Sequence, residues 1–434
     1  MVYVMEEAAR PLLWRLGRNP KGHRQAVIDI GSNSVRLIVY QVSGRSIVPR
    51  INEKVMAGLG EGLSNTGRLS EKGVESAMNA LARFHAICSS LGITNIRAIA
   101  TAAVREAEDG FEFCERIRRS TGIQVQILSG AEEAKFAALG VVAAQRNPTG
   151  LIGDLGGSSL ELVSVENGVL ATGETYKLGP LAMQDFMDAP VAKREAAILK
   201  ELRSRGDIAK RDQFIAVGGA WRAIAKTHMH HVGYSLHVLQ SYTIPTAEAV
   251  AFCTELLDKK GKLQMLAKNV AGRRVNNLPL TAHVLKAVLE ESAAKSLVIS
   301  AYGLREGIVF SEMPDDFKRL DPLLAGVTSL AKPDSGQAGF SKSLNDFLRK
   351  VLATLEPVFV DAPEQEERLI AASFILADIG AMMHPDHRAD IARQLVLRGP
   401  YTGIDHVGRV FLGLISAFRY SRKFLPTELE VTVL

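Results

Sequence analysis

Two short polar turns, far apart in the chain, carry residue types that can bind phosphate. They read "DIGSNS" from Asp29 and "DLGGSS" from Asp154, and apolar, strand-like segments flank both. Glycine lets an anion approach backbone N–H groups, and serine and asparagine add side-chain donors. Ordinary hairpin turns use the same residues, but the recurrence favours two turns that grip a phosphate chain from both sides. The candidate phosphate-binding residues are Ser32, Asn33, Ser34, Gly156, Gly157, Ser158 and Ser159.

A third glycine-rich turn, "AVGGAWRAI", leads from a strand-like segment into a helix-like one and contains Gly218. The N-terminus of the helix that follows such a turn can hold an anion or a nucleotide. A tight connection without any ligand would have the same sequence. Gly218 joins the candidate phosphate-binding residues on the first interpretation.

Acidic residues lie beside the turns, on segments where they are uncommon. Asp154 and Glu161 flank the second turn, and strands disfavour both residue types. Mg²⁺ retains several waters and uses few carboxylates, so this pair could hold it. A solvent-facing acidic pair is the alternative. Asp29, which begins the first turn, is the third candidate metal ligand.

Two further segments could supply the chemistry that the turns lack. Arg105 ends the strand-like "ATAAV", where a guanidinium could bind phosphate in a bidentate manner or form a surface ion pair. "SGAEEAKFAALG" places Glu132 and Glu133 in the first turn of a helix, where the helix dipole already favours acids. One of these carboxylates could instead face a cleft and accept a proton from an attacking water.

The elements that must position these residues follow one order twice. Each turn lies in a β-hairpin, and a third strand, a helix, a strand and a further helix follow. A repeat of this size predicts two similar α/β lobes around a cleft, over residues 24–134 and 135–312. Helical periodicity dominates from 319 to 434, which predicts a separate all-α domain. Residues 1–23 are predicted to be a flexible leader, with a short amphipathic helix as the alternative.

Composition excludes several classes of protein. The chain has 434 residues, 47% hydrophobic and 23% charged, with a net charge of +5. This mild basicity suits an anionic partner without identifying one, and no apolar run reaches the length of a membrane span. Cys88, Cys114 and Cys253 lie far apart, which argues against disulfides and thiolate metal sites and fits a cytoplasmic location. The histidines of "THMHHVGYSLH" lack a metal-site pattern and are expected to serve in packing.

Six segments match, in order, the motifs of a known family. "AVIDIGSNSVRLIVY", "ATAAVREA", "SGAEEA", "GDLGGSSLELV", "VGGAWRAIA" and "YGLREGIV" resemble the exopolyphosphatase and guanosine pentaphosphate phosphohydrolase family, from about 24 to 310. That family belongs to the actin, sugar kinase and Hsp70 superfamily, so the resemblance implies two duplicated actin-like (ribonuclease H-like) lobes and an all-α, HD-like C-terminal domain. Ser158 departs from the family's usual third glycine. The HD metal dyad is lost, because Ala377 rather than histidine precedes Asp378.

The resemblance also implies roles for residues. Glu132 is expected to be the general base, Arg105 to bind phosphate, and Asp154, Glu161 and Asp29 to support Mg²⁺, with K⁺ as a further candidate cation. The expected reaction is hydrolysis of terminal phosphate from inorganic polyphosphate, with conversion of guanosine pentaphosphate to tetraphosphate as the alternative. A homodimer is expected, with no nucleic-acid partner. A small-molecule kinase and an actin-like assembly protein are the competing classes. A basic track along the helical domain is expected to hold a long polyanion, over Arg388, Arg393, Arg398, Arg409, Arg419, Arg422 and Lys423.

Overall fold

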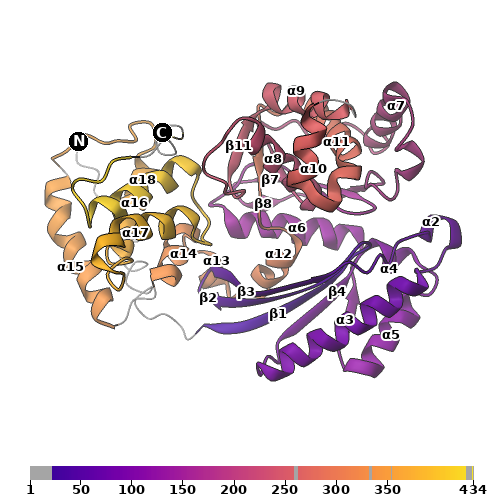
Figure 1. The fold of residues 1–434 in the computed structure, drawn as a ribbon, viewed down its shortest axis with the longest axis horizontal. Helices are drawn as coiled ribbons and strands as arrows, with labels where there is room; N and C mark the ends of the chain where they lie inside the picture. The colour runs from indigo at the N-terminus through magenta and orange to yellow at the C-terminus, as the bar shows by residue number, and fades with distance from the viewer. Residues whose placement is uncertain (1–21, 259–261, 332–334, 353, 427–432, 434) are drawn as a thin grey trace.

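The structure is a computed structural model, which describes residues 22–258, 262–331, 335–352, 354–426 and 433. Two α/β lobes lie one above the other in Figure 1, and a helical domain lies beside them. The predicted leader falls on residues 1–21, outside the described residues, and its last predicted residue, His23, already begins the first strand.

Lobe I is built on a five-stranded sheet in the order β3-β2-β1-β4-β5. The side chains of Ala26, Ile28 and Ile30 pack on the helices of one face, and Val27 packs on the other face. Asp29, which shares the alternation of Val27, therefore belongs to the face away from α3 and α5. The elements are β1 (His23–Ile30), β2 (Val35–Ser43), β3 (Ser46–Val55), α2 (Leu63–Thr66), α3 (Glu71–Ser90), β4 (Ile96–Ala100), α4 (Ala102–Glu106), α5 (Gly110–Thr121) and β5 (Val125–Ile127).

Lobe II repeats this order in a seven-stranded sheet, where β7, β6, β10 and β12 take the places of β2, β1, β4 and β5. These four strands confirm the prediction of a duplicated unit. The long helix expected over 181–211 is shorter, since α7 covers only Val191–Leu202. The strands are β6 (Gly150–Leu155), β7 (Leu160–Glu166), β8 (Val169–Leu170), β9 (Glu174–Tyr176), β10 (Gln213–Val217), β11 (Tyr242–Pro245) and β12 (Ser296–Ile299). The other helices are η1 (Gln184–Phe186), α8 (Gly219–His231), α9 (Thr246–Leu257), α10 (Lys262–Ala271), η2 (Gly272–Asn277) and α11 (Leu278–Ser292).

Two helices, α6 (Gly130–Ala144) and α12 (Leu304–Ser311), lie between the lobes (Figure 1). One side of α6 packs on the sheet of lobe I and the other on the sheet of lobe II. The two helices touch backbone to backbone, because a Cβ on Gly140 would collide with Gly303 and one on Gly307 would collide with Phe136. The lobe boundary predicted between 134 and 135 therefore falls inside a helix that both lobes share.

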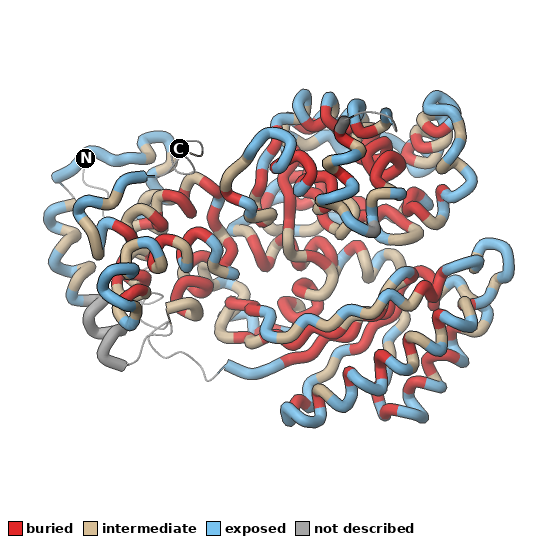
Figure 2. The backbone as a smooth tube through the Cα atoms, viewed as in Figure 1, coloured by how far each residue is buried: buried red, intermediate tan, exposed pale blue. Residues whose placement is uncertain are grey.

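The C-terminal part is all-α, as predicted, and its burial pattern is shown in Figure 2. Its helices are α13 (Asp315–Lys318), α14 (Pro322–Ala331), α15 (Ser335–Leu352), α16 (Pro363–Leu376), η3 (Pro385–His387), α17 (Arg388–Arg398) and α18 (His406–Phe418). The predicted basic track along this domain is wrong for two members. Arg393 and Arg409 are buried, and Arg409 donates to the carbonyls of Gly399 and Tyr401 at the end of α17.

Two predictions about the chain as a whole can be compared with this fold. Among the described residues no helix combines the length and the apolar character needed to cross a bilayer. Cys88, Cys114 and Cys253 are all buried and free, which confirms that they form no disulfide framework.

Candidate functional site

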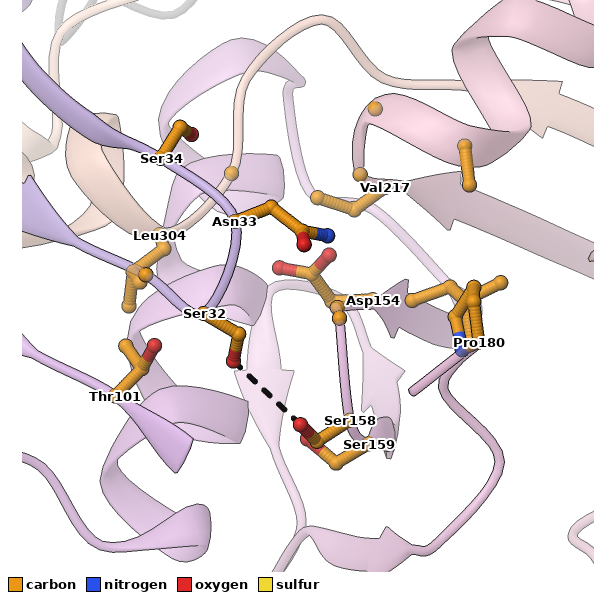
Figure 3. A pocket seen from close by; sticks show the side chains of 18 of the residues that line it. Ser32, Asn33, Ser34, Thr101, Asp154, Ser158, Ser159, Pro180, Val217 and Leu304 are labelled. Atoms are coloured by element: carbon orange, nitrogen blue, oxygen red, sulfur yellow. Dashed lines mark hydrogen bonds between the residues drawn. The ribbon is translucent and has the colours of Figure 1, made fainter. Parts of the chain in front are cut away.

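The two polar turns meet at the cleft between the lobes. The hydroxyls of Ser32 and Ser158 lie 3.5 Å apart (Figure 3). The turns have the same internal closure, since Gly31 N–H donates to Ser34 at 3.0 Å and Gly156 N–H donates to Ser159 at 2.9 Å. The sequence repeat therefore produces two copies of one backbone turn that face each other.

Neighbouring segments hold the carbonyl groups of both turns. The amides of Gly58 and Gly60 donate to the carbonyls of Asn33 and Ser32, at 3.2 and 2.9 Å. Those of Gly179 and Leu181 donate in the same way to the second turn, at 3.1 and 2.8 Å. Within the described chain, the backbone amides of the turn residues Ser32, Asn33, Gly157 and Ser158 have no protein acceptor. Fixed carbonyls and free N–H groups are what an anion-binding nest requires.

The turns open onto a cavity of about 460 Å³ between the lobes. Figure 3 shows the side chains of Asn33 and Asp154 turned toward one another in this space. Of the predicted site residues, the following line the cavity: Asp29, Ser32, Asn33, Ser34, Asp154, Gly156, Gly157, Ser158, Ser159, Glu161 and Gly218. The structure thus brings eleven of the predicted residues together, from three separate turns and their flanking strands.

Glycine is required at the third turn. Gly218 has a φ of 99°, and a Cβ there would lie 2.7 Å from the carbonyl oxygen of Leu155 and 2.8 Å from a carboxylate oxygen of Asp154. The turn consequently places the start of α8 directly against the end of β6. This close approach and the positive φ explain why a glycine occupies position 218.

The structure contradicts the expectation that Glu132 faces the cleft. Its carboxylate accepts hydrogen bonds from the backbone N–H and hydroxyl of Ser129, at 2.8 and 2.9 Å, in a capping box at the start of α6. These bonds, with a further one from Gln126, lower the pKa of Glu132. Glu132 is not among the residues that line the cavity. A carboxylate with a lowered pKa, bonded to the start of its own helix and outside the cavity, is poorly placed to accept a proton from a water in the cavity.

The neighbouring Glu133 takes the place expected for Glu132. It lines the cavity, and its side chain is only 12% exposed. Burial raises the pKa of Glu133 to about 7, although the guanidinium of Arg105 opposes this effect. A carboxylate whose pKa lies near neutrality is well suited to accept a proton.

Arg105 does not line the cavity but lies behind it. Its guanidinium forms an ion pair with Glu133 and donates to the carbonyl of Leu128 at 2.6 Å. The prediction that Arg105 itself binds phosphate is therefore not supported by its position. Arg105 orients Glu133 and adjusts the pKa of that carboxyl.

Asp154 and Glu161 form the acidic side of the cavity. They are opposite one another on β6 and β7, which places both side chains on one face of the sheet. Burial raises the pKa of Asp154 to about 6 and that of Glu161 well above the ordinary value. Oxygen Oε1 of Glu161 is buried, and in the described part of the chain it has no hydrogen-bond partner.

This pair fits a hydrated Mg²⁺, because an orphaned carboxylate oxygen and a second carboxylate face a space that also admits water and phosphate. The predicted third ligand does not join them. Asp29 lies in the other lobe, where Nε of Arg305 is 3.8 Å from its carboxylate. Among the described residues, no group of three or more His, Cys, Asp or Glu side chains could hold a metal ion.

Five cations around the cavity were not among the predicted site residues: Arg36, Lys54, Arg222, Arg274 and Arg305. Three of them lie in the quoted motifs: Arg36 in "AVIDIGSNSVRLIVY", Arg222 in "VGGAWRAIA" and Arg305 in "YGLREGIV". Arg36 pairs with Asp29 across the first hairpin and so shares its face of the sheet. Lys54 and Arg274 lie in segments with no motif, and only the fold brings them to the cavity.

The candidate sites outside the cleft do not gain support. His228 is buried and bonds to the hydroxyl of Tyr242 at 2.8 Å, as the packing interpretation predicts. In the helical domain, Asp378 forms an ion pair with Arg419 at 3.4 Å.

Comparison with known proteins identifies the family. A sequence model of the Ppx/GppA phosphatase family matches residues 37–316, well over half of the chain, and the exopolyphosphatase C-terminal domain matches residues 328–428. The chain belongs to the Ppx/GppA phosphatase family. The family expected from the six motifs is therefore confirmed.

Three curated relatives show how much of this chain is similar to known proteins. Exopolyphosphatase 1 of Mycobacterium tuberculosis (strain ATCC 25618 / H37Rv) is 31% identical over 183 residues, 41% of this chain and 53% of the relative. The chain thus matches about half the length of this relative. Exopolyphosphatase 1 of Mycobacterium leprae is 25% identical over 68% of this chain and 90% of the relative. Retrograde regulation protein 2 of Saccharomyces cerevisiae is 25% identical over 94% and 75%.

Solved structures confirm the predicted fold. The Ppx/GppA family member of Aquifex aeolicus superposes with a TM-score of 0.59 at 23% identity, over 67% of this chain and 97% of that one. An exopolyphosphatase from Cytophaga hutchinsonii gives a TM-score of 0.59 at 21% identity, with the same coverage. Both support the actin-like arrangement of two lobes.

Proposed function

We propose that this protein removes the terminal phosphate of inorganic polyphosphate by hydrolysis. The observation that carries the proposal is Glu133, a buried carboxylate with a pKa of about 7 in the cavity between two phosphate-nest turns. The names of its mycobacterial relatives agree with this substrate.

In the proposed reaction, the free amides and hydroxyls of the two turns bind the terminal phosphoryl group. A water molecule lies between this group and Glu133. As the water oxygen bonds to phosphorus, its proton passes to Glu133, and the bond from phosphorus to the bridging oxygen breaks. The shortened chain leaves with the electron pair of that bond, and orthophosphate is released.

Cationic side chains of the cavity stabilise the negative charge that develops on the phosphoryl oxygens. Arg305 lies 3.8 Å from the carboxylate of Asp29. Arg222 is fixed by its bond to the carbonyl of Ala301 at 2.6 Å. Mg²⁺ held by Asp154 and Glu161 would add further positive charge at the same oxygens. Arg105 keeps the carboxylate of Glu133 in position for the proton transfer.

Hydrolysis of guanosine pentaphosphate is the second candidate. Beyond the phosphate turns, the cavity continues into lobe II along Ala220, Leu278 and Thr281. Such a mixed apolar and hydroxyl-bearing wall is a suitable surface for a nucleoside. The homodimer expected from the family resemblance remains a prediction.

Orthophosphate release from long-chain polyphosphate and from guanosine pentaphosphate, measured side by side with and without Mg²⁺, tests the proposal. We expect release from polyphosphate that depends on Mg²⁺. Exclusive release from guanosine pentaphosphate would establish the second candidate instead. No release from either substrate by the intact, folded chain would refute both.

A further inference from the structure

One connection in lobe II is bonded both to the helical domain and to the backbone beside the cavity. It covers residues 232–241, between α8 and β11. Its Gln240 is only 5% exposed, and the amide side chain and the main-chain carbonyl of this residue form separate hydrogen bonds. The first bond leads toward the cavity and the second toward the helical domain. The proposed chemistry does not use Gln240.

The side chain of Gln240 holds the backbone just beyond the end of β12. Tyr242 pairs with Ile299, the last residue of β12, and the N–H of Ser241 donates to the carbonyl of Ile299 at 2.9 Å. A side chain makes the next bond, because Oε1 of Gln240 accepts from the N–H of Ala301 at 2.9 Å. The amide of Gln240 thus extends the pairing of β11 and β12 to a residue that belongs to neither strand.

The carbonyl of the same Ala301 fixes a cation of the cavity. Nη1 of Arg222 donates to this carbonyl at 2.6 Å. Among the described residues, this is the one side-chain hydrogen bond of Arg222, and its guanidinium forms no ion pair. A long side chain has several staggered rotamers available to it. The position of this guanidinium in the cavity therefore depends on where the backbone lies at Ala301.

The helical domain holds the main chain of Gln240. His406, the first residue of α18, is buried, and its Nδ1 lies 2.6 Å from the hydroxyl of Tyr234. Its Nε2 lies 3.1 Å from the carbonyl oxygen of Gln240. A carbonyl can only accept, so Nε2 carries the proton and Nδ1 accepts from the hydroxyl of Tyr234. Burial lowers the pKa of His406 to about 4, which agrees with a neutral ring that has one donor and one acceptor.

Apolar packing surrounds this contact between the connection and the helical domain. Leu236 of the connection forms a buried cluster with Leu397 of α17 and Val410 of α18. The rings of Tyr242 and His406 are stacked, with their centroids 5.9 Å apart. The series of hydrogen bonds that ends in the cavity therefore starts at a packed interface between lobe II and the helical domain.

We infer that Gln240 is a positioning residue, which fixes the guanidinium of Arg222 for the reaction, and that the helical domain contributes to this through His406. The inference rests on the proposed function, in which Arg222 stabilises the negative charge that develops on the phosphoryl oxygens. It gives the helical domain a part in the reaction, although none of its described residues lines the cavity. If Gln240 served only to satisfy a buried N–H group, its loss would lower the stability of the fold and leave the contribution of Arg222 intact.

A double-mutant cycle between Gln240 and Arg222 tests the inference, with kcat and KM for long-chain polyphosphate as the readout. Gln240→Met removes the acceptor for the N–H of Ala301. We expect kcat to fall about 10-fold with little change in KM, because a displaced guanidinium loses part of the roughly 10²–10³-fold effect of one donor to the transition state. In an Arg222→Met background the same substitution should have no further effect, since the group that it displaces is already absent. An equal loss of kcat in both backgrounds would overturn the inference.

Two further variants test the ends of the bonded series. His406→Phe keeps an aromatic ring but removes the donor to the carbonyl of Gln240, and it should lower kcat about 3-fold, the effect of one neutral hydrogen bond. This loss should also vanish in the Arg222→Met background, so His406→Phe carries the test if Gln240→Met does not fold. Gln240→Glu retains an acceptor oxygen for the N–H of Ala301 and should keep most of the turnover.

Gln25→Met is the matched control. Gln25 is also buried, and its amide donates to Glu312 at 2.7 Å, but it is not among the residues that line the cavity. We expect Gln25→Met to lower the unfolding temperature as Gln240→Met does, and to leave kcat of the folded enzyme unchanged. A loss of kcat in Gln25→Met as large as in Gln240→Met would assign the effect to lost stability and overturn the inference.

Failure of the inference differs from failure of the proposed function. If the inference alone fails, the wild type releases orthophosphate, and Gln240→Met either keeps its full kcat or loses the same fraction with and without Arg222. If the proposed function fails, the wild type releases no orthophosphate, and the role of Gln240 in positioning Arg222 falls with it.

Discussion

In each lobe, four residues lie opposite one another on adjacent strands and form a row across the sheet. The two rows differ in the charge of their side chains. In lobe I the row runs through Ile99, Asp29, Arg36 and Lys54, and in lobe II through Val217, Asp154, Glu161 and Thr175. An aspartate is the next-to-last residue of β1 in lobe I and of β6 in lobe II. At the next strand, however, lobe I has an arginine that is hydrogen-bonded to Asn52 at 2.7 Å, and lobe II has a buried glutamate with an unpaired oxygen.

This difference shows how a duplicated backbone can acquire two functions. The hairpins keep the same register, so both rows deliver side chains to one cleft. The basic row suits the binding of phosphate, and the acidic row suits the binding of a cation that neutralises phosphate. Glu133, on the helix between the lobes, faces the cavity that both rows enter. We therefore expect substitutions at Glu133 and in the acidic row to reduce turnover, and substitutions in the basic row to weaken binding.

The largest expected effect comes from Glu133→Gln. Loss of a general base lowers the rate about 10²–10⁴-fold. The neutral isostere should leave the fold unchanged. The matched control is Glu132→Gln, because glutamine also completes a capping box. Orthophosphate release should be nearly lost in the first variant and retained in the second. The reverse result would restore Glu132 as the base.

A smaller loss is expected from Glu161→Gln in the acidic row. Replacing one carboxylate of a metal site should raise the Mg²⁺ concentration needed for half-maximal activity by at least the roughly 10–100-fold that follows loss of a group supporting a metal ligand. A titration of activity with Mg²⁺ measures this, and high Mg²⁺ should restore part of the turnover. Glu201→Gln, on α7 and not among the cavity residues, is the control. An unchanged Mg²⁺ requirement would show that the acidic row does not support the ion.

The pH dependence of turnover tests the coupling between Arg105 and Glu133. The base must be ionised, and burial raises the pKa of Glu133 to about 7, so turnover should fall as the pH drops below 7. Arg105 lowers this pKa. Without this guanidinium, in Arg105→Met, the fall in turnover at acidic pH should therefore begin at a higher pH. Arg105→Lys keeps the charge and should shift this acidic limb of the pH profile less. A structural defect alone would lower turnover at every pH without shifting the limb.

The sequence carried most of the information about the turns but not about the residues around them. The repeated pattern predicted two facing nests, because hairpin turns of one sequence adopt one backbone. The choice between Glu132 and Glu133 was also available, since Ser129 and Glu132 have the spacing of a capping box, which turns Glu132 back toward Ser129. Lys54 and Arg274 could not be found in this way. They meet only because two lobes, joined by α6 and α12, close on one another.

The smallest expected effect concerns Lys54, in the basic row of lobe I, and the pH dependence of polyphosphate binding. Burial and the nearby guanidiniums of Arg274, Arg36 and Arg305 lower the pKa of Lys54 to about 8, against the opposing carboxylate of Asp29. Lysine binds phosphate only while protonated, so the KM for long polyphosphate should rise as the pH increases through 8, by at most the roughly 10-fold contribution of one charged hydrogen bond. In Lys54→Met this rise should disappear, and in Lys54→Arg it should move beyond the measured range, because arginine stays protonated. If KM still rises with pH in Lys54→Met, another group causes the rise. The protonation of Lys54 would then have no part in binding polyphosphate.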